Sequence, residues 1–112
     1  MAYEFEGKSI ETTATGYLVN ADEWSKALAE HIAGLDGVTL TERHWDVIDY
    51  LRDEYFNDNQ NTPNTRAILK AMSERWNARV DQRMLYELFP LDPSKQGGRI
   101  AGLPESKRKA GY

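Results

Sequence analysis

The segment from residue 39 to residue 61 constrains the fold most, because it carries the clearest amphipathic helix of the chain. One face of this helix is lined by side chains that recur every three or four residues: Trp45, Ile48, Leu51, Arg52 and Tyr55. At its start, Thr39 and Glu42 fit a capping box, and Thr41 is a competing N-cap. Polar residues from 57 to 61 end the pattern. Such a stripe needs other elements to bury it, so we expect a packed domain.

Three further helices are predicted by the same two signals, a capping residue and an apolar stripe. The first begins behind Asn20 and stops near residues 34–37, where two glycines lie. The second covers about residues 63–77, with Thr62 as its N-cap and a proline at the first helical position. The third is short and begins behind Asp81, and the prolines that follow prevent its continuation.

The two ends of the chain are predicted to differ from this helical middle. Residues 3–18 alternate apolar and polar side chains around Gly7, which predicts a small β-hairpin. After Leu91, glycines and prolines break every period, so we expect a flexible C-terminal arm at residues 94–112. Residues 1–93 then form a single domain, which a chain of 112 residues with 40% hydrophobic content can support. The predicted fold class is mainly α (α+β): a small helical bundle with an N-terminal β-hairpin.

Composition excludes several classes of protein. The chain has no cysteine, which excludes disulfides, zinc sites built from cysteine, and thiol nucleophiles. No apolar run approaches the about 18 residues that a membrane span requires, and residues 1–6 lack the features of a signal peptide. We therefore expect a cytoplasmic protein that does not enter the membrane.

Charge is distributed unevenly along the sequence. Residues 1–60 carry 13 acidic and 4 basic side chains, a net charge of −9, whereas residues 61–112 carry 5 acidic and 10 basic ones, a net charge of +5. Arg66 and Lys70 lie four residues apart on the helix predicted over residues 63–77, and with the preceding helix they are compatible with a helix-turn-helix. Nucleic-acid contact by these two residues is one interpretation. Ordinary solvated basic side chains are the other.

Three other groups of side chains each have a plain structural explanation. An acidic ridge on the central helix offers too few converging oxygens for a cation: Glu42, Asp46, Asp49 and Asp53. His31 and His44 do not have the spacing of a metalloenzyme helix. The three tryptophans, at positions 24, 45 and 76, lie on apolar stripes and are predicted to pack in the core. We expect no metal site and no cofactor.

Several short motifs stand in a specific order along the chain. In this order they are Gly16-Tyr17-Leu18, Leu40-Thr41-Glu42-Arg43-His44-Trp45, Leu88-Phe89-Pro90 and Ala101-Gly102-Leu103-Pro104. Together they span nearly the whole sequence, and their order resembles the DsrC/TusE family of sulfur-relay proteins. The resemblance implies a compact bundle of helices with a small hairpin and a C-terminal arm, which agrees with the pattern described above.

The resemblance also implies where the chemistry of the family would lie. Family members carry sulfur on a penultimate cysteine of a mobile arm, and DsrC itself has a second cysteine upstream. In this sequence the two corresponding positions are Gly111 and Gly98. A thiolate is the group that accepts and releases persulfide sulfur. We therefore expect no catalytic residue in this chain and no carriage of sulfur by it.

Two hypotheses about function follow. In the first, the chain is a non-catalytic partner-binding or regulatory paralogue. It engages through its arm a sulfur-relay partner of the sulfite-reductase or tRNA 2-thiouridine pathway, as the resemblance implies. Its candidate contacts are Arg99, Gly102, Leu103 and Pro104. In the alternative, the chain is a nucleic-acid-binding regulator that uses Arg66 and Lys70. A third interpretation, in which the glycines at 98 and 111 replace cysteines of a natural carrier, requires two independent changes and a rebuilt tail.

Overall fold

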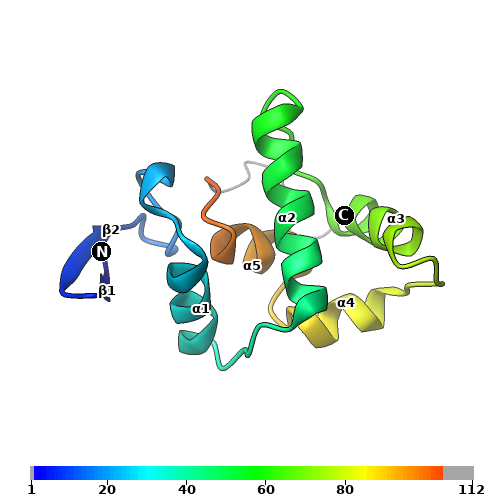
Figure 1. Ribbon diagram of the computed structural model, residues 1–112, viewed down its shortest axis with the longest axis horizontal. Coiled ribbons are helices and arrows are strands. Elements are labelled where there is room, and N and C mark those ends of the chain that lie inside the picture. Colours follow the sequence, from blue (N-terminus) through cyan, green and yellow to red (C-terminus); the bar gives the residue numbers. More distant parts are fainter. Residues whose placement is uncertain (1, 105–112) are drawn as a thin grey trace.

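Figure 1 shows the computed structural model, which describes residues 2–104 of the chain. In chain order its elements are β1 (Ala2–Phe5), β2 (Lys8–Glu11), the short 3-10 helix η1 (Ala21–Glu23), α1 (Lys26–Leu35), α2 (Glu42–Asn57), α3 (Thr65–Arg75), α4 (Gln82–Leu88) and α5 (Pro93–Ile100). This architecture confirms the predicted α+β class, which is mainly α, and the N-terminal β-hairpin.

The helices pack around α2 and α5. In Figure 1, α1 and the hairpin lie on one side of α2, and α3 and α4 lie on the other. Helix α5 contacts all four other α-helices. The core is built from side chains that are almost completely buried: Leu28, Ile48, Leu51, Ile68, Leu85, Phe89 and Ile100. Among the described residues, no helix is long and apolar enough to cross a lipid bilayer.

The hairpin has the turn that its sequence predicts. Strands β1 and β2 pair antiparallel, with Ala2 opposite Glu11 and Phe5 opposite Lys8. The two connecting residues, Glu6 and Gly7, have positive φ angles of 51° and 76°. Positive φ at both central positions is the property of the two-residue turn whose twist matches paired strands. The hairpin therefore forms locally, and it packs against α1.

Residues 94–104 differ from the flexible arm that we expected from residue 94 onward. Asp92 accepts hydrogen bonds from the backbone N–H groups of Ser94 (2.9 Å) and Lys95 (3.0 Å), and Pro93 occupies the first turn of α5. These are ordinary start signals of a helix. The helix continues through Gly97 and Gly98, and the chain stays buried as far as Leu103.

Close packing explains why two glycines do not end α5. A Cβ atom at Gly97 would lie 3.1 Å from Leu51 Cδ1, so the absence of a side chain lets α5 approach α2 closely. Glycine weakens an isolated helix by about 1 kcal/mol relative to alanine, and the burial of Ile100 and of the neighbouring backbone offsets that loss. The chain is thus part of the core up to Leu103, and residues 105–112 lie outside the described part of the chain.

The starts of two helices differ from the predicted positions. Asn20 caps η1 instead of α1, and α1 begins later, with Ser25 Oγ accepting a hydrogen bond from the N–H of Leu28 (3.1 Å). Helix α3 is capped by Asn64, not Thr62. Pro63 precedes this cap, and its carbonyl oxygen accepts a hydrogen bond from Ser94 Oγ (2.7 Å). The predicted cap of α4 is confirmed, since Asp81 accepts from the N–H of Met84 (3.0 Å).

His44 explains why α2 begins behind Thr41 rather than Thr39. The backbone N–H of Thr41 donates to His44 Nδ1 (3.0 Å), so the imidazole takes the place of the glutamate in a capping box. The proton of the neutral ring is then on Nε2, which lies 2.8 Å from the carbonyl oxygen of Leu88 and donates to it. His44 therefore connects the start of α2 to the end of α4, and burial lowers the pKa of His44 below its usual value.

The lowered pKa of His44 predicts a pH-dependent stability. The unfolded chain protonates His44 at about pH 6.5, before the folded chain does, so the free energy of unfolding decreases as the pH falls below that value. A His44→Gln variant has no such proton to take up. We expect urea midpoints of the parent protein to decrease between pH 7.5 and pH 5.5 more steeply than those of the variant. Parallel decreases would show that His44 is not the titrating group.

Candidate functional site

The C-terminal end of α5 is closed by a Schellman motif. The N–H of Leu103 donates to the carbonyl oxygen of Gly98 (3.0 Å), and the N–H of Gly102 donates to that of Arg99 (3.2 Å). Gly102 occupies the left-handed position of this motif, with a φ of 75°. The motif reverses the chain sharply and places Leu103 in the core, where it is 2% exposed.

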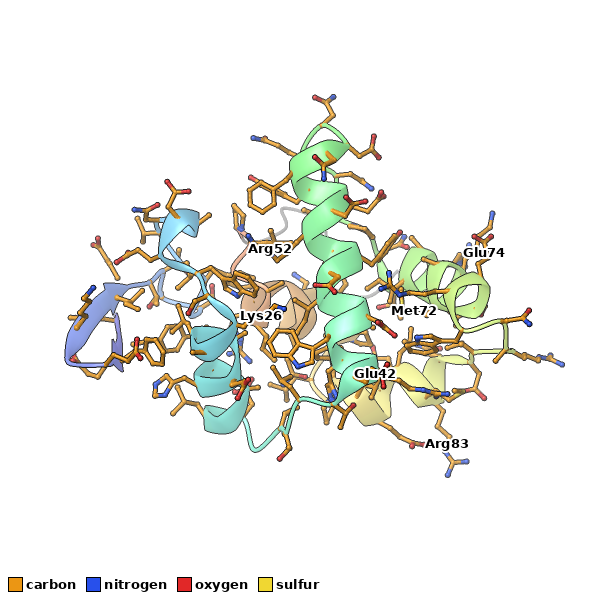
Figure 2. The ribbon with its side chains drawn as sticks, viewed as in Figure 1. Lys26, Glu42, Arg52, Met72, Glu74 and Arg83 are labelled. Atoms are coloured by element: carbon orange, nitrogen blue, oxygen red, sulfur yellow. The ribbon has the colours of Figure 1, made fainter. Side chains whose placement is uncertain are left out.

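Two side chains from distant parts of the sequence bind the carbonyl groups at this helix end. Trp24 Nε1 donates to the carbonyl oxygen of Ile100 (2.8 Å), and Arg52 donates to that of Ala101 (2.7 Å). The guanidinium carbon of Arg52 lies 3.9 Å from the centre of the Trp24 ring. Figure 2 shows Arg52 on the face of α2 that is turned toward α5. The backbone carbonyls that a helix normally leaves without partners are therefore bound by side chains.

Arg99 lies on another face of α5 and pairs with Asp36, the residue that follows α1. Gln96 Nε2 donates to the same carboxylate (3.1 Å). Both partners of the ion pair are mostly buried, with side chains 19% and 16% exposed. The hydroxyl of Tyr3 lies nearby. Burial raises the pKa of Tyr3, while Arg99 acts to lower it and Asp36 to raise it. Arg99 thus fastens α5 to α1.

A small hollow of about 20 Å³ lies beside Gly98. Its walls come from four parts of the chain: Tyr17, Leu51, Thr62, Pro63, Ser94, Lys95, Leu103 and Pro104. A Cβ atom at Gly98 would meet no heavy atom within 4 Å. Position 98 therefore has room for a small side chain, although glycine occupies it.

The structure places the four residues predicted to contact a partner in three different settings. Arg99 is engaged with Asp36, Gly102 and Leu103 are buried, and Pro104 is exposed. Contact of these residues with a partner stays a prediction. Gly98 is buried beside the hollow, and Gly111 lies outside the described residues.

The two basic residues predicted for nucleic-acid contact lie on α3 and are exposed. Lys70 lines a shallow groove between α2 and α3 with Glu54 and Glu74. Burial raises the pKa of Tyr50 in this groove, and the neighbouring carboxylates raise it further. The negative charge beside Lys70 is unfavourable for a phosphate backbone.

The other groups with potential chemistry serve the fold. Asp46, from the predicted acidic ridge, accepts a hydrogen bond from Trp76 Nε1 (2.7 Å) and pairs with Arg75 (3.3 Å). The ring of His31 packs against Phe5, with ring centres 5.3 Å apart. Within residues 2–104, no three histidine, aspartate or glutamate side chains converge into a possible metal site.

Sequence analysis missed the roles of Trp24, Arg52 and Asp36 at the end of α5. A signal was present for Arg52, because an arginine within an otherwise apolar stripe must find hydrogen-bond acceptors when the stripe is buried. A buried tryptophan likewise needs an acceptor for its N–H group. The acceptors are backbone carbonyls 49 and 76 residues away along the chain, and no local pattern reveals such partners.

Comparisons with known proteins agree with this geometry. A family model described as DsrC like protein matches residues 4–108. The chain is 44% identical over 103 residues to Sulfurtransferase TusE from Yersinia pseudotuberculosis serotype I (strain IP32953), and this match covers 91% of the chain and 94% of that protein.

Two solved structures have a similar fold and similar sequences. The NMR structure of DsrC from Allochromatium vinosum is 35% identical, with a TM-score of 0.84 and coverage of 97% of both chains. The crystal structure of the oxidized gamma-subunit of the dissimilatory sulfite reductase (DsrC) from Archaeoglobus fulgidus is 30% identical, with a TM-score of 0.86. That match covers 98% of this chain and 100% of the other.

Alanine substitutions at two glycines of α5 and its terminus should act in opposite directions. Gly98→Ala adds a methyl group into open space and improves helix propensity, so the free energy of unfolding should increase by about 0.5–1 kcal/mol. Gly102→Ala should decrease it by more than about 1 kcal/mol, because its Cβ would lie 2.3 Å from Trp24 Cδ1 and its φ is positive. Urea unfolding measures both.

Gly37→Ala is the matched control for Gly102→Ala. Gly37 has nearly the same φ, 76°, but a Cβ atom there would meet nothing within 4 Å. Its substitution by alanine therefore measures only the loss of stability that a side chain at positive φ causes. If Gly102→Ala and Gly37→Ala destabilise the protein equally, the contact between Gly102 and Trp24 contributes nothing to the tight turn.

Proposed function

Because this chain belongs to the DsrC-like family of sulfur-relay proteins, we propose that it binds a protein partner of the sulfur-relay or sulfite-reductase type without carrying sulfur itself. The observation that supports this most directly is the absence of cysteine from all 112 residues. Persulfide transfer needs a thiolate, and neither the thioether of methionine nor the phenol of tyrosine replaces it.

The retained backbone around α5 supports a role in binding. The Schellman motif, the ion pair of Arg99 and the buried side chain of Leu103 place Pro104 at the surface in a defined position. We propose that the chain beyond Pro104 is the part that reaches the partner.

The nucleic-acid alternative has no support in the comparisons, whose proteins are named as a sulfurtransferase and as a subunit of a sulfite reductase. Lys70 also lies beside Glu54 and Glu74, which weakens its attraction for phosphate. Binding of a protein partner is therefore the function that we propose.

Affinity capture tests the proposal. The full chain and a version that ends at Pro104 are immobilised and exposed to native lysate. We expect the full chain to retain a sulfurtransferase of the tRNA-thiolation relay or a sulfite reductase, and the shortened chain to lose it. Truncation at Pro104 leaves α5 in the core, whereas truncation at Pro93 would remove the helix that contacts α1, α2, α3 and α4.

A shuffled tail supplies the control for charge. In this variant residues 105–112 keep their composition, including Lys107, Arg108 and Lys109, but their order is changed. Retention that depends on sequence should be lost, whereas retention caused by the positive charge alone should persist at low salt and disappear at high salt. Equal capture by the full, shortened and shuffled chains would contradict the proposal.

A separate experiment tests the absence of sulfur carriage. The parent chain, incubated with a persulfide donor, should gain no sulfur by intact-mass spectrometry. A Gly111→Cys variant, which supplies a thiol at the penultimate position, should gain one sulfur atom that a thiol reductant removes. A reducible gain of sulfur by the parent chain would show that it carries sulfur without a cysteine, and the proposal would fail.

A further inference from the structure

We propose that Trp24 and Arg52 are positioning residues that, with Gly102, fix the direction in which the chain leaves the domain at Pro104. We call these three residues the exit clamp. This inference rests on the proposed function, because the direction of exit determines where the chain beyond Pro104 meets a partner.

The first support is the placement of the two hydrogen bonds. Trp24, in the segment between η1 and α1, and Arg52, on α2, bind the carbonyl groups of two successive residues, Ile100 and Ala101. Because the two donors come from different elements, the peptide groups cannot rotate together without losing at least one bond. Each lost bond would leave a carbonyl oxygen in a largely buried setting without its partner.

The second support is steric. Gly102 makes the sharp turn that only glycine adopts readily, and the Trp24 side chain fills the space where a Cβ atom at position 102 would lie. The nearest Trp24 atoms to that Cβ are Cδ1, Cγ and Cβ, at 2.3, 2.6 and 2.8 Å. The indole therefore covers the turn on one side, and the backbone at Gly102 has little freedom to move toward it.

The third support is the environment of Arg52. Its guanidinium carbon lies 3.9 Å from the centre of the Trp24 ring and 4.9 Å from that of Phe56. Within residues 2–104, Arg52 forms no ion pair with a carboxylate. This partly buried cation is therefore stabilised by two aromatic rings, by the carbonyl of Ala101 and by the negative charge of Asp49. A planar guanidinium can stack on the rings and donate to the carbonyl at the same time, whereas a lysine ammonium cannot stack.

Arg43 on α2 and Trp76 at the end of α3 give a matched control. The Arg43 guanidinium stacks on Trp76 at 4.6 Å, and Trp76 Nε1 donates a hydrogen bond of 2.7 Å to Asp46. This pair also stacks a guanidinium on an indole, but the indole N–H binds the Asp46 side chain and not the backbone at the exit. Arg43→Met and Trp76→Phe should therefore reproduce any general loss of stability without changing the exit.

The direction of exit is measured first, without any partner. The chain has no native cysteine, so Pro104→Cys and Gln82→Cys accept spin labels at two defined positions, both exposed. We expect the distance distribution between the labels to become broader when Arg52→Met or Trp24→Phe is added, and to stay unchanged when Arg43→Met or Trp76→Phe is added. Equal widths in all four backgrounds would overturn the exit clamp. Urea midpoints confirm that each variant is folded under the conditions used.

Partner capture with the unlabelled full chain is measured second. Arg52→Met and Trp24→Phe should lower the affinity for the captured partner about fivefold, because a partner must then order the exit itself. Arg52→Lys should not rescue binding, since it keeps the charge but loses the planar contact with Trp24. Affinity equal to that of the Arg43→Met control would overturn the inference. If the full chain captures no partner, the proposed function fails, while the spin-label distances still decide whether the exit clamp exists.

Discussion

Helix α5 joins the two sides of the domain, and it can approach α2 closely because it has no side chain at Gly97. Gly97 lets the helix approach Leu51 of α2, and α1 packs against the same helix from the other side. A side chain at Gly97 would push α2 and α5 apart by a few tenths of an ångström or force Leu51 to move. Arg52 follows Leu51 directly, so such a displacement would also lengthen its hydrogen bond to Ala101. The spacing of two helices and the binding of the chain end thus depend on one contact.

Sequence patterns predicted the elements that are determined by residues close together in the chain. The stripe of α2, the two-residue turn of the hairpin and the Asp81 cap of α4 all depend on residues within one or two turns of each other. Helix α5 was missed because glycine and proline indicate breaks when only neighbouring residues are considered. Its stability comes from contacts with α1, α2, α3 and α4, which are remote in sequence. The predicted cap of α3, Thr62, was wrong because the side chain of Asn64 accepts the hydrogen bond from the N–H of Ala67 instead (2.9 Å).

The family was predictable from the order of the motifs, but the roles of the residues within the motifs were not. Arg99 was predicted to contact a partner and instead has a buried carboxylate as its neighbour in this structure. Arg52 and Trp24 were assigned to the core, and their polar atoms bind the backbone that leaves it. A sequence motif shows which residues belong together, whereas the acceptor of each donor is a property of the folded chain. Tryptophan and arginine combine a large apolar surface with a polar end, which suits them to the boundary between core and exit.

The open space beside Gly98 has an evolutionary consequence. Because a Cβ atom at this position meets no neighbour within 4 Å, the packing of the domain does not require glycine there. A lineage can gain a small side chain at position 98 without moving the neighbouring elements, and the higher helix propensity of other residues favours such a gain. Gly102 is the opposite case, since Trp24 excludes any other residue. Related chains can therefore differ in the side chain at position 98, while position 102 keeps glycine and the same backbone turn.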